Sequence, residues 1–170
     1  MYAVIMAGGR GTRFWPRSRE KKPKHLLDII SEKTIIQETV DRIKPLIHPD
    51  NILVVTGKKH ARALMKQLPE IPSRNIIIEP EGKNTAACIG LAALHIQKIV
   101  SDEIMIVLPS DHAIADSCNF LDVLKAAANV AGQEEAWSLS ALSLPASKQV
   151  LATLSWQNLF NTSSKKKFFA

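Results

Sequence analysis

Residues 7–13 have the composition of a phosphate-binding loop. Their sequence is Ala-Gly-Gly-Arg-Gly-Thr-Arg, and it follows the short apolar run 3–6. Glycines directly after a strand let backbone N–H groups approach a phosphate with no side chain in the way. Arg13 offers a planar fork for bidentate phosphate binding, and Lys24 offers a movable point charge. We predict an anion site here, the alternative being a glycine-rich turn beside a solvated basic stretch; the spacing fits neither a dinucleotide fingerprint nor a P-loop.

Residues 79–86, Glu-Pro-Glu-Gly-Lys-Asn-Thr-Ala, form a second candidate site between an apolar run and a predicted helix. A helix N-terminus with small residues gives a ligand access to free backbone donors. Asn84 can read the edge of a base, because its amide both donates and accepts hydrogen bonds. The alternative is that Asn84 or Thr85 only caps the helix.

A third candidate is Asp111, in the segment Leu-Pro-Ser-Asp-His at residues 108–112. A carboxylate just beyond a strand can hold Mg²⁺ against substrate phosphates, although a turn-forming Asp is common at such a place. Cys88 lies among apolar residues and is expected in the core. The remaining histidines lack the spacing of metal ligands: His25, His48, His60 and His95.

The elements that position these residues alternate along the chain. Continuously apolar runs at 3–6, 52–56, 76–78 and 104–108 predict buried strands, separated by helical patterns at 34–47, 58–68, 84–100 and 120–130. This alternation predicts an α/β protein with a parallel sheet covered on both faces. Because ligands bind beyond the carboxyl ends of such strands, we expect the three candidate segments to meet at one edge.

Composition excludes several classes of protein. A chain of 170 residues with 46% hydrophobic residues is typical of one domain with a core. We expect no membrane span and no secretory signal, and the two cysteines favour a reducing, cytoplasmic setting. Of the net charge of +6, residues 138–170 carry +4 (four lysines, no acid) and residues 1–137 the other +2. We therefore predict no nucleic-acid partner, and the oligomeric state cannot be deduced.

Four ordered motifs make the chain similar to the sugar nucleotidyltransferases, and to the mannose-1-phosphate guanylyltransferases in particular. The matching segments are 8–16, 23–27, 79–86 and 108–112, with His25 and Ser110 as mild departures from Gln and Ala. The resemblance implies a Rossmann-like three-layer α/β/α nucleotide-diphospho-sugar transferase fold. It also implies the reaction of GTP with mannose 1-phosphate to give GDP-mannose, a precursor for polysaccharide biosynthesis, and pyrophosphate, with Mg²⁺ as cofactor.

Carried over by position, the resemblance assigns roles to single residues. Arg13 and Lys24 are the implied catalytic residues, with Arg13 on the β- and γ-phosphates and Lys24 on the α-phosphate or the sugar phosphate. Asp111 is the implied metal ligand. The implied nucleotide-binding residues, besides Arg13, are Gly8, Gly9, Gly11, Thr12, Glu81, Asn84 and Thr85.

The resemblance runs from residue 1 to about residue 137 and then stops. The family's later motifs (a Gly-Tyr-rich segment, a Glu-Lys-Pro segment and a second metal-binding Asp) do not follow. We predict that residues 1–137 are the nucleotide-binding part, and that residues 138–170 are an atypical tail from a frameshift or gene disruption. The fold would then be incomplete, with an open apolar sheet edge after four strands. The Ser-Leu alternation at 138–144 is compatible with an edge strand. The alternative function is a non-catalytic nucleotide-binding remnant.

Overall fold

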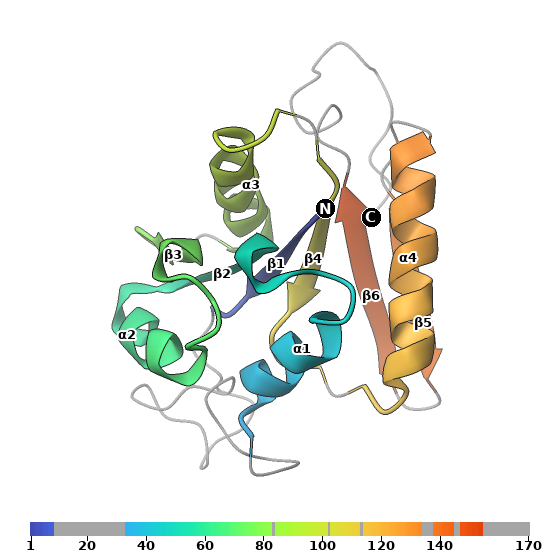
Figure 1. The fold of residues 1–170 in the computed structure, drawn as a ribbon, viewed down its shortest axis with the longest axis horizontal. Helices are drawn as coiled ribbons and strands as arrows, with labels where there is room; N and C mark the ends of the chain where they lie inside the picture. The colour runs from blue at the N-terminus through green and yellow to red at the C-terminus, as the bar shows by residue number, and fades with distance from the viewer. Residues whose placement is uncertain are drawn as a thin grey trace.

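The computed structural model describes residues 1–8, 33–82, 84–101, 103–112, 114–133, 138–144 and 147–154. Within these residues, six strands form one sheet in the order β3-β2-β1-β4-β6-β5 (Figure 1). The strands are β1 (Tyr2–Met6), β2 (Ile52–Gly57), β3 (Ile76–Glu79), β4 (Met105–Pro109), β5 (Ser138–Leu144) and β6 (Ser147–Leu154).

The first four strands are parallel. β1 lies between β2 and β4, and β3 pairs with the outer side of β2. Met6, the last residue of β1, is opposite Val55 of β2 and Pro109 of β4. All four carboxyl ends therefore lie at one edge of the sheet, as the sequence predicted.

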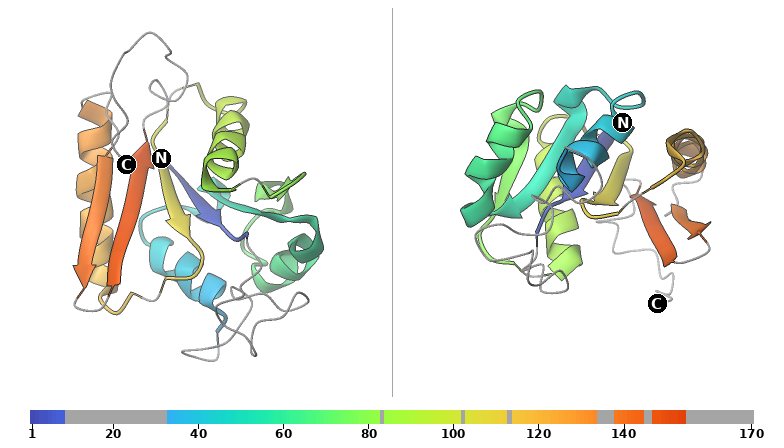
Figure 2. Two further views of the ribbon diagram at one scale, coloured as in Figure 1. Left: turned by 180° about the vertical axis from the view of Figure 1, so that it is seen from behind. Right: turned by 90° about the horizontal axis from the view of Figure 1, so that it is seen from below.

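Helices cover both faces of this parallel part, which gives the predicted Rossmann-like α/β/α layering. They are α1 (Ile35–Ile43), α2 (Lys58–Gln67), α3 (Asn84–Gln97) and α4 (Ser117–Gln133), with short 3-10 turns η3 (Pro49–Asn51) and η4 (Ser73–Asn75). α1, α2 and α4 lie on one face and α3 lies on the other (Figure 2). None of the helices within the described ranges is long and apolar enough to cross a membrane.

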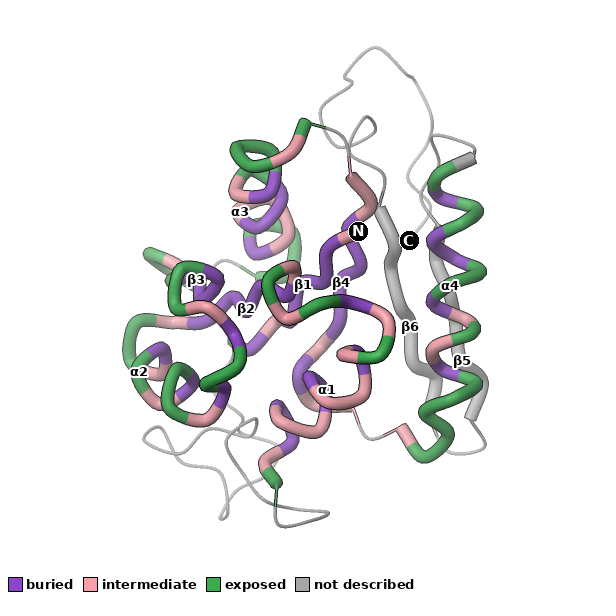
Figure 3. Tube along the Cα trace, viewed as in Figure 1, coloured by how far each residue is buried: buried purple, intermediate pink, exposed green. Residues whose placement is uncertain are grey.

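Alternation along the strands divides the core into two apolar layers. Ala3 and Ile5 of β1 face α1, α2 and α4, whereas Tyr2 and Val4 face α3. All four are buried, and the burial continues along β2 and β4, as Figure 3 shows. Apolar residues at successive positions are expected when both faces of a strand are covered.

Helix α1 ends earlier than the apolar pattern at 34–47 predicts. Lys44 still has helical backbone angles and its N–H donates to the Val40 carbonyl oxygen (3.0 Å), but Pro45 has no N–H with which to continue the helix beyond it. Leu46 and Ile47 continue in a turn, and their N–H groups both donate to the Ile43 carbonyl oxygen. Ile47 is still buried, which explains why the periodicity seemed to continue.

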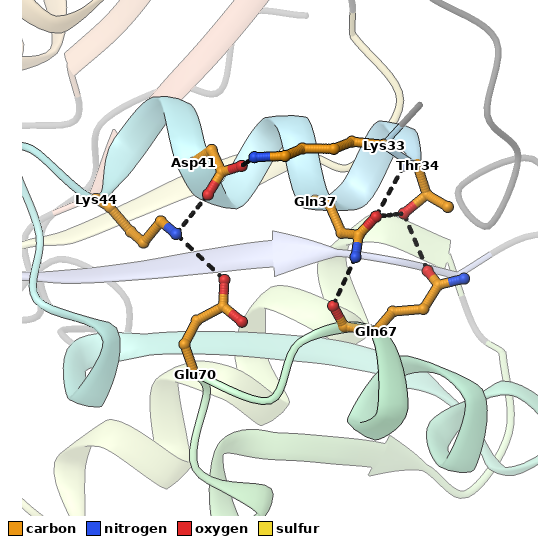
Figure 4. A network of polar contacts seen from close by, with 7 residues as sticks. All are labelled: Lys33, Thr34, Gln37, Asp41, Lys44, Gln67 and Glu70. Atoms are coloured by element: carbon orange, nitrogen blue, oxygen red, sulfur yellow. Dashed lines mark hydrogen bonds and ion pairs between the residues drawn. The ribbon is translucent and has the colours of Figure 1, made fainter. Parts of the chain in front are cut away.

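Polar contacts join α1 to the end of α2 (Figure 4). Gln37 accepts from the Thr34 N–H (2.9 Å) and its amide donates to the Gln67 carbonyl oxygen (2.9 Å). Beside these, an ion-pair chain runs through Lys33, Asp41, Lys44 and Glu70. Since Thr34 immediately precedes α1, the contacts with Gln37 and Gln67 fix the point where the chain enters this helix.

The far side of β4 is paired, contrary to the expectation of an open edge. β6 runs antiparallel to β4, from Met105 opposite Leu154 to Val107 opposite Ala152, and β5 follows as the outer strand. The arrows of β4 and β6 point in opposite directions in Figure 1. Hydrogen bonds between β6 and β4 satisfy the backbone N–H and C=O groups of β4 that were expected to be exposed at an open edge. β5 occupies the edge position that its Ser-Leu alternation suggested.

Candidate functional site

The chain reverses its order across the sheet at the carboxyl ends of β1 and β4. From β1 it proceeds through β2 to β3 on one side, and β4 then lies on the other side of β1. Ligands of open α/β sheets bind at such a switch point. Met6 and Pro109 are paired, so Gly8 and Asp111 each lie two residues beyond a shared register position.

Hydrogen bonds from both neighbouring strands fix the exit of β1. The Ala7 N–H donates to the Val55 carbonyl oxygen (2.8 Å), and the Ser110 N–H donates to that of Met6 (3.1 Å). The fully buried Thr56 hydroxyl donates to the Ala7 carbonyl oxygen (2.9 Å). The chain therefore enters the predicted phosphate loop from a fixed point, and Gly8 is exposed there.

Most of the predicted phosphate-binding residues lie outside the described residues. These are Gly9, Gly11, Thr12, Arg13 and Lys24. Gly8 is the part of the loop that the structure describes.

The second candidate segment lies at the start of α3. Glu81, Asn84 and Thr85 are all exposed there. Asn84 has a φ of 67°, the left-handed conformation that Asn and Gly adopt more readily than other residues. An ordinary N-cap residue has an extended backbone. The simple capping role considered for Asn84 therefore does not describe its conformation, and strained backbone of this kind is concentrated at functional sites.

Glu79 begins the second candidate segment but received no role of its own from the sequence; it ends β3 at the same edge. A Cβ built on Gly8 would lie 3.4 Å from the Glu79 carboxylate oxygen Oε2. Glu79 also forms a hydrogen bond with the thiol of buried Cys88 on α3. Burial, and then the charge of Glu79, raise the pKa of this thiol to about 12. The available signal was position: Glu79 directly ends an apolar strand, whereas Glu81 is two residues further into the connection.

Asp111 follows β4 with a half-buried side chain. Its Oδ1 lies 3.9 Å from Nε2 of His112. No group of three or more His, Cys, Asp or Glu side chains that could hold a metal occurs in the part of the chain that the structure describes. Mg²⁺ in nucleotide sites usually takes one or two carboxylates together with substrate phosphates and water. A single hard oxygen donor, two residues beyond the pair from which Gly8 also leaves the sheet, therefore fits this ion.

Comparison with known proteins decides the family. A family model described as nucleotidyl transferase matches residues 2–144. The chain belongs to the nucleotidyl transferase family. This confirms the resemblance drawn from the four motifs.

Curated proteins named as mannose-1-phosphate guanylyltransferases are similar over most of this chain. Mannose-1-phosphate guanylyltransferase 2 of Escherichia coli O157:H7 is 41% identical over 135 residues, which is 77% of this chain and 28% of that protein. Mannose-1-phosphate guanylyltransferase of Klebsiella pneumoniae is 40% identical over 133 residues, 76% of this chain and 28% of that protein. The chain thus spans little more than a quarter of the length of these relatives.

A solved structure described as mannose-1-phosphate geranyltransferase from Thermus thermophilus has the same fold. Its TM-score is 0.70 at 32% sequence identity, over 78% of this chain and 38% of that one. The Rossmann-like architecture predicted from the sequence is confirmed.

Proposed function

We propose that this chain carries the nucleotide-binding part of an enzyme that transfers GMP from GTP to mannose 1-phosphate. The products are GDP-mannose and pyrophosphate. The observation that carries the proposal is the placement of Gly8 and Asp111 two residues beyond the paired Met6 and Pro109. Relatives named mannose-1-phosphate guanylyltransferase support GTP and mannose 1-phosphate as the substrates.

In this proposal the protein acts by positioning and by charge stabilisation. The sugar phosphate oxygen attacks the α-phosphorus in line, and no protein nucleophile is required. Backbone N–H groups from Gly8 onward, including Gly9, Gly11 and Thr12, approach the triphosphate. Arg13 holds the β- and γ-phosphates, and Lys24 meets the α-phosphate or the sugar phosphate.

Asp111 is the proposed Mg²⁺ ligand. When bound, the ion would neutralise part of the negative charge on the phosphates. The carboxylate of Asp111 holds it at the β4 side of the switch point, and the described geometry supports this role because Ser110 ties the same turn to β1.

Glu81, Asn84 and Thr85 are proposed to lie against the guanosine. The exposed start of α3 gives a nucleoside access to backbone donors and to the Asn84 amide. The left-handed conformation of Asn84 supports the proposal, because it turns the chain at the point where the base is expected.

A second candidate function is nucleotide binding without turnover. The observation in its favour is that the predicted nucleotide-binding residues within the described ranges are all exposed: Gly8, Glu81, Asn84 and Thr85. It accords with the proposed division into a nucleotide-binding part, 1–137, and a tail, 138–170. For either function we propose a cytoplasmic location.

The deciding experiment follows pyrophosphate release from GTP, Mg²⁺ and mannose 1-phosphate, beside the melting temperature with and without GTP. Turnover supports the transferase and excludes the remnant. Stabilisation by GTP without turnover supports the remnant, because a ligand that binds the native state alone raises its stability. If GTP gives neither turnover nor stabilisation, both are wrong.

A further inference from the structure

Arg42 lies where α1, the turn after β4 and the start of α4 come together. It belongs to the last turn of α1, next to buried Ile43. Its Nη1 donates to the His112 backbone carbonyl oxygen (3.5 Å). Its guanidinium carbon lies 5.9 Å from the ring centroid of Phe120 in α4. One side chain therefore contacts two segments that are far from it in sequence.

The aromatic contact gives this side chain a firm support. Phe120 is 2% exposed and belongs to the core cluster that α1 and α4 share. A guanidinium over an aromatic face, at about 6 Å from its centroid, is attracted by the ring. The Arg42 fork is thereby held in place when it reaches the His112 carbonyl.

The positively charged guanidinium group of Arg42 is half-buried. Burial lowers the pKa of its guanidinium, and the neighbouring charge of Glu38 opposes that effect. An arginine stays protonated nonetheless. Burying a charged group is unfavourable unless hydrogen bonds replace its lost hydration. For Arg42 the acceptor is the His112 carbonyl oxygen, in the turn that bears Asp111.

Asp111 stands between two backbone anchors. On one side, the Ser110 N–H donates to the Met6 carbonyl oxygen of β1 (3.1 Å). On the other, the His112 carbonyl oxygen accepts from Arg42. We propose that Arg42 is a positioning residue for Asp111, which it holds at the carboxyl edge of β4 through the His112 carbonyl. That Asp111 binds Mg²⁺ rests on the proposed function. That Arg42 holds residues 110–112 in place does not depend on it.

The first test is hydrogen exchange of the protein without ligand. Arg42→Met keeps an apolar, unbranched side chain at this position but donates no hydrogen bond, so amides of residues 110–112 should exchange about tenfold faster. Exposed Arg62→Met on α2 is the matched control and should leave them unchanged. Unchanged exchange at 110–112 in Arg42→Met overturns the proposal, as does equal acceleration in β1, which reports a loss of global stability.

Arg42→Lys is the second variant, because it keeps the stem and the charge but loses the planar fork. If Arg42→Met does not fold, faster exchange at 110–112 in Arg42→Lys supports the proposal. Exchange at the wild-type rate overturns it.

The second test connects the position of Asp111 with the metal. Melting temperature is followed against Mg²⁺ concentration at saturating GTP, and the midpoint should shift to about tenfold higher Mg²⁺ in Arg42→Met. In EDTA, GTP should stabilise Arg42→Met as much as it stabilises the wild type. This control shows that the variant has lost metal binding and not stability in general. An unshifted midpoint overturns the metal-positioning role. If wild type shows no Mg²⁺-dependent effect of GTP, the proposed function fails while the exchange result still decides whether Arg42 fixes the turn.

Discussion

The Ser110 N–H donates to the Met6 carbonyl oxygen across 3.1 Å, one step beyond the last residue pair of β1 and β4. This bond joins the exits of the two strands at the switch point of the sheet. Gly8 and Asp111 both leave from this shared position, and Thr56 fixes the β1 exit from the β2 side. The candidate site thus starts from backbone that three strands hold in place, which is what the proposed transfer by positioning requires.

Replacing Thr56 by Val tests this support. The variant keeps the shape of the side chain but removes the donor to the Ala7 carbonyl oxygen, at a fully buried position. We expect a loss of about 1–2 kcal/mol in the free energy of unfolding, measured by urea denaturation. Thr39→Val is the control, because that buried hydroxyl donates to Ile35 within its own helix turn. A smaller loss for Thr56→Val than for Thr39→Val would contradict the bracing role.

Replacing Gly8 by Ala should separate folding from nucleotide binding. The added Cβ meets Glu79 Oε2 at 3.4 Å, an ordinary van der Waals distance, so the melting temperature should change little. In the proposed site the methyl group stands where the backbone approaches a phosphate, so stabilisation by GTP and Mg²⁺ should be lost. Gly90→Ala in α3 is the control: its Cβ meets nothing within 4 Å, and it should stabilise by about 0.5–1 kcal/mol. Full GTP stabilisation in Gly8→Ala would show that the phosphates lie elsewhere.

Replacing Asp111 by Asn should remove the response to the metal. The amide keeps the size of the side chain but is a much poorer Mg²⁺ ligand than a carboxylate. We expect a loss of Mg²⁺-dependent stabilisation by GTP, followed as melting temperature against Mg²⁺ concentration. Asp122→Asn on α4 is the matched control, since its exposed ion pair with Lys125 contributes little. An identical Mg²⁺ response in Asp111→Asn and Asp122→Asn would exclude Asp111 as the ligand.

The sequence predicted the elements that carry strong local signals. Four apolar runs specified the parallel strands, and the patterns at 58–68 and 84–100 specified α2 and α3 to within three residues. It failed where a contact joins distant segments. Arg42 looked like one more polar helix residue, because its partners, His112 and Phe120, are 70 and 78 residues away in sequence. β6 was missed because its pairing with β4 is decided by the sheet edge and not by its own pattern.

The division at residue 137 stays a prediction, and the coding DNA tests it. The loss of acids after residue 137 is the property expected of a shifted reading frame. Reading the other two frames beyond codon 137 should restore a Gly-Tyr-rich segment and later a Glu-Lys-Pro segment. If neither frame contains them, residues 138–170 are the protein's own sequence, and the pairing of β6 with β4 becomes the natural completion of its sheet.

The two cysteines should differ greatly in reactivity, although both are free. Burial, and then the charge of Glu79, raise the pKa of the Cys88 thiol to about 12, so far less of it is thiolate at pH 7 than for a thiol of ordinary pKa. Because the thiolate is the nucleophile, iodoacetamide should label Cys88→Ala, which keeps exposed Cys118, far faster than Cys118→Ser, which keeps Cys88.

The contribution of Glu79 is separable from that of burial. In Cys118→Ser, adding Glu79→Gln removes the negative charge beside the thiol, so the Cys88 pKa falls and alkylation over pH 7–10 becomes faster. The rate should stay below that of Cys118, because burial, the larger cause, is unchanged. Equal rates with Glu and Gln at position 79 would mean that the Cys88 thiol reacts only after α3 opens, and that Glu79 has no direct effect on it.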